Sequence, residues 1–109
     1  PKIFSNGLDL ASFETEQELF SFLQNSAGAF ARLISLGCPT IAMVNGHAFA
    51  AGFYLALCHD YIIMRGDRGY LCFNEMAFGA AACYHNVVMG KDKMDTRVYQ
   101  QLYTEAKKI

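Results

Sequence analysis

The strongest constraint on the fold is a change in the spacing of apolar residues near Gly37. Within Thr15–Leu36 apolar residues recur at alternating steps of three and four, which is the spacing of one face of a helix. Gly37 and Pro39 are typical of a helix end, and Thr40–Val44 is a short apolar run of strand length. The sequence therefore predicts one long helix followed directly by a buried strand.

The beginning of this helix carries a capping signal. Thr15 followed three residues later by Glu18 forms a plausible capping box, in which each side chain accepts a hydrogen bond from a free backbone N–H. The apolar positions that predict the buried face of the helix are Phe20, Leu23, Ala27, Phe30 and Ile34.

The rest of the chain continues the alternation of strands and helices. The predicted strands are the end of one at Lys2–Ser5, which the Asn6–Gly7 turn terminates, then Tyr61–Met64 and an extended piece at Tyr70–Phe73. The predicted helices are Ala50–Leu57, Ala80–Met89 and Asp95–Lys108. This order predicts an α/β fold with a mostly parallel sheet, and 109 residues suffice for one domain over residues 1–109.

Composition excludes several classes of function. Nine basic and ten acidic residues leave a formal net charge of -1, so no electrostatic footprint for nucleic acid is present. The longest apolar stretch, Ala48–Cys58, is too short for a membrane span, which needs about 20 residues. The cysteines have neither disulfide density nor metal-ligand spacing, which predicts free, buried thiols and no metal site. They are Cys38, Cys58, Cys72 and Cys83.

Two sharp turns could present backbone N–H groups to a ligand. One is Gly7–Leu8 after the first strand, and the other is Ala50–Gly52 at the start of a helix. The first N–H groups of a helix lack internal partners and lie at the positive end of its dipole. A second interpretation stays open, in which the small residues only allow close helix packing.

Several ordered segments resemble the crotonase superfamily. Lys2–Leu10 resembles its first oxyanion-hole segment, and Pro39–Leu57 resembles its second. The segments His59–Arg65, Asp67–Gly69 and Phe73–Gly79 are similar to its Δ3,Δ2-enoyl-CoA isomerase branch, especially the plant-type peroxisomal enzymes. The order and spacing of several segments make the resemblance more specific than any single motif.

The resemblance implies a crotonase-like (ClpP/crotonase) core of repeated ββα and βα units, here a partial acyl-CoA-binding domain that is incomplete at both ends. The similarity weakens after Gly79, because Ala80–His85 lacks the proline-containing segment that is usual in the family. A fragment of a longer enzyme that forms a homotrimer or larger assembly is therefore expected.

The resemblance also assigns roles to individual residues. It implies that the Leu8 and Ala51 N–H groups hold the thioester oxygen and that Glu75 is the single catalytic base. Tyr54 falls where hydratases of the family carry a second glutamate, and its ordinary pKa of about 10 makes it a poor base. The predicted substrate-binding residues are Asn6, Gly7, Leu8, Asp9, Leu10, Ala51 and Tyr54. A structural ion pair at Glu75 and a packed aromatic at Tyr54 remain alternatives.

The function that follows from the resemblance is a double-bond shift in fatty acyl-CoA during β-oxidation. Coenzyme A is part of the substrate, so no separate cofactor is expected. A peroxisome or the mitochondrial matrix is expected from the family alone, since no targeting signal is visible. Two alternatives stay open: a noncatalytic crotonase-fold subunit of an assembly and, against the evidence of Tyr54, an enoyl-CoA hydratase.

Overall fold

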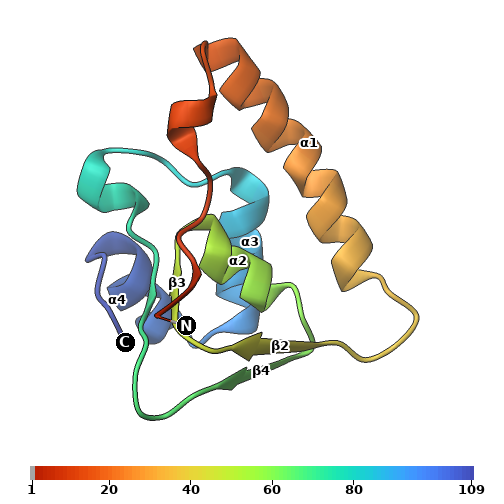
Figure 1. Cartoon of the computed structure of the whole chain (residues 1–109), viewed down its shortest axis with the longest axis vertical. Helices are drawn as coiled ribbons and strands as arrows, with labels where there is room; N and C mark the ends of the chain where they lie inside the picture. The colour runs from red at the N-terminus through yellow and green to blue at the C-terminus, as the bar shows by residue number, and fades with distance from the viewer. Residues whose placement is uncertain (1) are drawn as a thin grey trace.

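The computed structural model describes residues 2–109, and Pro1, the first residue of the predicted domain, lies outside the described residues. Strands and helices alternate along most of the chain (Figure 1). The elements are β1 (Ile3–Ser5), the 3-10 helix η1 (Leu10–Ser12), α1 (Glu16–Ile34), β2 (Ile41–Val44), β3 (His47–Phe49), α2 (Ala51–Leu57), β4 (Tyr61–Met64), β5 (Leu71–Cys72), the 3-10 helix η2 (Glu75–Phe78), α3 (Tyr84–Lys93) and α4 (Thr96–Thr104).

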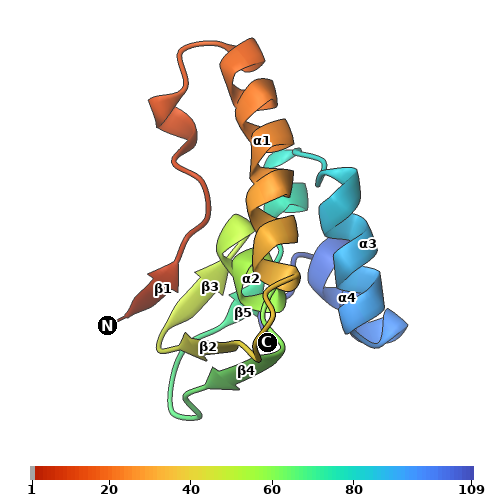
Figure 2. The same cartoon turned by 90° about the vertical axis from the view of Figure 1, so that its right-hand side faces the viewer.

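The strands form two small parallel sheets. One sheet has the order β1-β3-β5, and the other pairs β2 with β4, with Ile41 opposite Tyr61. In Figure 2 the strands gather at one end of the molecule, and α1 rises away from them. The predicted α/β class with parallel pairing is confirmed.

The core is built around α2. This helix contacts both sheets, and most of its side chains are buried. Phe73, which follows β5, stacks on Phe53 at 4.5 Å and on Tyr54 at 4.4 Å between ring centroids. Tyr99 and Leu102 of α4 complete this cluster. The short α2 is therefore held by packing around most of its surface, since seven residues would not form a stable helix alone.

Helix α1 forms close to the predicted limits, but half of its capping box differs. The Thr15 hydroxyl oxygen accepts a hydrogen bond from the Glu18 N–H at 3.2 Å, as predicted. The Glu18 carboxylate accepts from the N–H of Glu14 at 2.9 Å rather than from that of Thr15. The carboxylate therefore binds the chain one residue further out, which still satisfies a free donor before the helix.

The prediction that the whole apolar face of α1 is buried was wrong. Phe20 is 60% exposed and Ile34 is 49% exposed, while Leu23, Ala27 and Phe30 are partly buried. The helix rises beyond the sheets, so only part of its apolar face meets other described residues (Figure 2). Within residues 2–109, no helix is both long enough and apolar enough to cross a membrane.

The strand predicted to be buried, β2, is buried on one face only. Ala42 and Val44 are 3% and 1% exposed, whereas Ile41 and Met43 are 53% and 65% exposed. Helix α2 covers one side of the β2-β4 sheet, and the described chain leaves the other side open. The prediction from an apolar run was therefore wrong for alternate residues, because the run does not reveal which faces are covered.

The helix predicted for Ala80–Met89 begins four residues later. The N–H of Ala82 donates a hydrogen bond to the hydroxyl oxygen of Tyr103 at 3.0 Å, so this segment stays extended until Cys83. Helix α3 then runs on to Lys93. The helix predicted for Asp95–Lys108 has Asp95 as its cap and ends at Thr104. A contact with a distant tyrosine thus overrides the helix propensity of alanine.

The cysteines are free thiols, and two of them lie in the core. Cys58 and Cys72 are buried as predicted, whereas Cys38 is exposed and Cys83 is partly buried. Burial raises the pKa of Cys58 to about 11, which keeps it a neutral thiol at physiological pH.

Candidate active site

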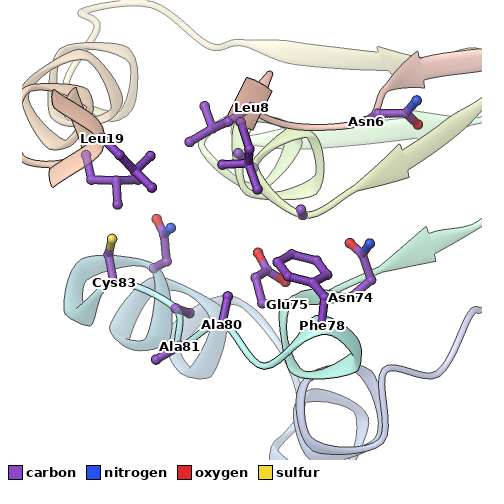
Figure 3. A pocket seen from close by; sticks show the side chains of 15 residues that line it. Asn6, Leu8, Leu19, Asn74, Glu75, Phe78, Ala80, Ala81 and Cys83 are labelled. Carbon is purple, nitrogen blue, oxygen red and sulfur yellow. The ribbon is translucent and has the colours of Figure 1, made fainter. Parts of the chain in front are cut away.

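A cavity of about 260 Å³ lies where the segment after β1, helix α1, the start of α2, η2 and the segment before α3 meet. Figure 3 shows Leu8 and Leu19 on one side of it, with Glu75 and Cys83 on the other. Its wall is mostly apolar, and its polar groups are few. Such a cavity suits an apolar ligand that a small number of polar groups hold in place.

The turn after β1 brings the first predicted amide donor to the second. Gly7 has a φ of +92°, which favours glycine, and its N–H donates to the Ser5 Oγ at 3.2 Å. A Cβ atom added to Gly7 would lie 3.0 Å from the backbone nitrogen of Ala51. Leu8, the next residue, and Ala51 both line the cavity. Neither N–H donates a hydrogen bond within residues 2–109, so both are free for a ligand.

The start of α2 is held in a strained conformation. Ala50 has a φ of +50° and a ψ of -127°, a combination that L-residues rarely adopt and that costs about 1–3 kcal/mol. Its N–H donates to the Cys72 carbonyl oxygen at 3.0 Å, and its own carbonyl oxygen accepts from Phe53 and Tyr54. These bonds turn the chain from β3 into α2 without a loop, which places Ala51 in the first turn of the helix beside the cavity.

Glu75 places a carboxylate in the same cavity. It is the first residue of η2, and its side chain points into the cavity in Figure 3. Its Oε2 atom is buried and has no hydrogen-bond partner among residues 2–109. Burial raises the pKa of Glu75 above its ordinary value, and a backbone hydrogen bond offsets part of that effect. The structure therefore does not support the alternative of a structural ion pair within the described chain.

The buried carboxylate should lower stability at neutral pH. Because the folded protein holds the Glu75 proton to a higher pH than the unfolded chain does, stability should fall as pH rises from 4.5, the ordinary value, through the raised pKa. Glu75→Gln should therefore melt at a higher temperature than wild type at about pH 7.5, and this gain should vanish at about pH 4. Thermal unfolding of both proteins at the two pH values measures it.

The same substitution at an exposed carboxylate, Glu105→Gln, is the control and should show no such pH-dependent gain. Equal melting temperatures for wild type and Glu75→Gln at both pH values would contradict the argument.

Tyr54 lies in the core and not in the wall of the cavity. Its side chain is 0% exposed, and its hydroxyl has no partner among residues 2–109. Burial, with the nearby charge of Glu75, raises its pKa far above the ordinary range. Tyr54 therefore stays protonated, and the packed-aromatic interpretation describes its position.

Four of the seven residues predicted to bind substrate line the cavity, and three do not. Those in the wall are Asn6, Leu8, Leu10 and Ala51, and those outside it are Gly7, Asp9 and Tyr54. Gly7 acts on the site through its turn. Asp9 is exposed, and its carbonyl oxygen accepts from the Ser12 hydroxyl at 2.7 Å.

Most other residues of the wall were not identified as site residues from the sequence. Helix α1 contributes Leu19 and Leu23, the extended segment contributes Ala80–Ala82, and α3 contributes Asn86. The i, i+4 spacing of the two leucines was a signal for a shared face of α1. The part played by Ala80–Ala82 and Asn86 depends on packing between distant segments, for which the sequence carried no signal.

Asp60 lies outside the cavity and has a structural role. The Asp60 carboxylate accepts from the backbone N–H and the hydroxyl of Thr40 at 2.7 and 2.8 Å, which ties β4 to β2 and lowers the pKa of Asp60. Among residues 2–109, no group of three His, Cys, Asp or Glu side chains is placed to hold a metal ion.

The chain is similar to several known proteins. Residues 1–105 match the family model described as enoyl-CoA hydratase/isomerase. The chain is 50% identical over 76 residues to the peroxisomal enoyl-CoA delta isomerase 1 of Arabidopsis thaliana, covering 69% of this chain and 32% of that protein. It is 38% identical over 116 residues to the peroxisomal enoyl-CoA delta isomerase 2 of that plant, covering 99% of this chain and 48% of that protein.

The fold also matches solved structures. An enoyl-CoA hydratase/isomerase family protein from Pseudomonas syringae superposes with a TM-score of 0.93 at 23% identity, covering 100% of this chain and 48% of the other. The chain thus spans less than half the length of the curated relatives and of this structure.

Proposed function

Because this chain belongs to the enoyl-CoA hydratase/isomerase family, we propose that the full-length protein is a Δ3,Δ2-enoyl-CoA isomerase. Its substrate is a fatty acyl-CoA, and Glu75 is the group that moves the proton. Relatives named enoyl-CoA delta isomerase, at 38% to 50% identity, support the reaction class.

One observation carries the proposal: the cavity is lined by a single carboxylate and by two residues whose backbone N–H groups have no partner among residues 2–109. Of the described residues that line it, Glu75 alone is acidic, and Leu8 and Ala51 supply the amides. Moving a double bond by one position needs one base that can also return the proton. Adding water across a double bond requires a positioned water as well, which in this family a second glutamate helps to hold.

The reaction starts when the ionised Glu75 takes a proton from C2 of a 3-enoyl thioester. The electron pair moves into the thioester carbonyl, and the N–H groups of Leu8 and Ala51 stabilise the negative oxygen of the resulting enolate. Protonated Glu75 then returns the proton at C4, the double bond settles between C2 and C3, and the carboxylate is regenerated. A raised pKa makes the Glu75 carboxylate a stronger base for the first step.

The position of Tyr54 argues against hydration. The family resemblance puts this residue where hydratases carry their other glutamate, and here it is buried and remains protonated. It therefore cannot act as the second base that would activate water.

The peroxisome is the proposed location, because the relatives named above are peroxisomal proteins. A homotrimer or a larger assembly remains the proposed state of the full-length protein, and coenzyme A enters only as part of the substrate.

The test is to assay the full-length protein with 3-enoyl-CoA for isomerisation and with 2-enoyl-CoA for hydration, while calorimetry measures binding of a saturated acyl-CoA. We expect isomerisation with little hydration. Efficient hydration would overturn the proposal in favour of a hydratase. Acyl-CoA binding without either reaction would overturn it in favour of the noncatalytic subunit.

A further inference from the structure

Among residues 2–109, Asn86 is the one amide or charged residue whose whole side chain is buried, since Glu75 is only partly buried. Its side chain is 8% exposed, and its Oδ1 atom has no hydrogen-bond partner among those residues. Burying an amide oxygen without a partner is unfavourable, because water satisfied it in the unfolded chain. Such an atom calls for a partner from outside the described chain, and a bound ligand can be that partner.

The position of Asn86 points to the ligand of the main cavity. Asn86 lies in the first turn of α3, and its N–H donates to the Cys83 carbonyl oxygen at 3.0 Å. Asn86 and Cys83, three residues apart at the start of α3, lie on the same face, and both line the cavity. Figure 3 shows Cys83 across from Leu19 at one end, with Glu75 further along. Asn86 is therefore a polar group in the apolar wall beyond the reacting carboxylate.

We infer that Asn86 hydrogen-bonds a hydroxyl group on the acyl chain, so that the preferred substrates are hydroxylated 3-enoyl-CoA esters. The inference rests on the proposed function, since it assigns the far end of this cavity to the acyl chain. It makes Asn86 a residue that selects the substrate, while the proton transfer still depends on Glu75.

A hydroxyl group fits this position better than other substituents do. The atom without a partner is the Oδ1 acceptor, so the ligand must donate a hydrogen bond to it. A hydroxyl can donate and stays neutral in an apolar wall, whereas a carbonyl oxygen only accepts and an ammonium would bury a positive charge. An anionic substituent would meet Glu75 without a counter-charge, because the described wall of the cavity contains no Lys, Arg or His.

The experiment compares 3-enoyl-CoA esters of equal chain length with the full-length protein. One ester is plain, and the others carry a single hydroxyl at successive carbons beyond C4. Wild type should favour the best hydroxylated ester by about 10- to 100-fold in kcat/KM, the range for a buried polar group left without its partner. Asn86→Leu, which keeps the size of the side chain but removes the amide, should abolish that preference.

Two further variants sharpen the comparison. Asn86→Ser keeps a hydrogen-bonding group and should retain part of the preference, and it also serves if Asn86→Leu does not fold. Asn25→Leu makes the same change at an exposed position of α1 and should leave the preference unchanged. Calorimetry with saturated plain and hydroxylated esters should show the same ratios in binding affinity.

The two proposals can fail separately. Isomerisation of the plain ester by wild type reports on the proposed function, whereas the ratio between esters reports on Asn86. The inference would be overturned if wild type had nearly equal kcat/KM for the hydroxylated and plain esters, or if the preference survived in Asn86→Leu. Either result is what a bound water or a purely structural amide at this position would give.

Discussion

Glu75→Gln should lower the rate of isomerisation by about 10²- to 10⁴-fold, the usual loss when a general acid-base group is removed. Glutamine has nearly the same shape, so the cavity and the stacked Phe73 two residues earlier should be undisturbed. It cannot accept the C2 proton, however, and within the described wall of the cavity no other carboxylate can replace it. Steady-state kinetics of the full-length protein with 3-enoyl-CoA measures the effect.

Binding separates this effect from misfolding. The affinity for a saturated acyl-CoA should change little, because the Leu8 and Ala51 amides remain in place. Glu105→Gln, at an exposed position, should isomerise at the wild-type rate. If Glu75→Gln isomerises normally, Glu75 is not the base, and the carboxylate has another role in the cavity.

The activity and stability of this variant should change in opposite directions. Removing a charge that burial disfavours stabilises the fold at neutral pH, while it removes the base. Observing both changes would place Glu75 among the residues that function requires at the expense of stability.

Local signals predicted the elements that depend on local chemistry. Thr15 and Gly37 bracket α1 to within about three residues, because a cap and a helix stop act over one turn. Strand β3 was missed because its three residues follow a turn and precede a helix with no room for a pattern. It exists because it pairs with both β1 and β5, which are distant in sequence.

In the site, too, residues marked by local motifs were predictable, and residues placed by packing between distant segments were not. Leu8, Ala51 and Glu75 were identified because the family motifs mark them, and the structure brings all three to one cavity. Asn86 was not identified, since its burial depends on how α3 packs beside α1 and α2. The resemblance puts Tyr54 where hydratases of the family carry a glutamate, and only the structure shows that Tyr54 lies in the core.

The close contact between α2 and β1 should make Gly52 intolerant of any side chain. A Cβ atom at Gly52 would lie 2.5 Å from the Ser5 carbonyl oxygen and 2.6 Å from its Oγ, so Gly52→Ala must push the strand away from the helix. Overpacking of this kind costs about 1–3 kcal/mol. Ser5 also holds the turn at Gly7, so its displacement should move the Leu8 amide away from that of Ala51.

Gly52→Ala should therefore lose both stability and activity. Losing one oxyanion donor would lower kcat by about 10²- to 10³-fold on top of the loss in stability. The matched control is Gly28→Ala in α1, where a Cβ atom would meet nothing within 4 Å. Because glycine is a poor helix former, that variant should gain about 0.5–1 kcal/mol and keep its activity. Denaturant unfolding and kinetics of both variants test the argument, and wild-type values for Gly52→Ala would show that the spacing of α2 and β1 does not control the two amides.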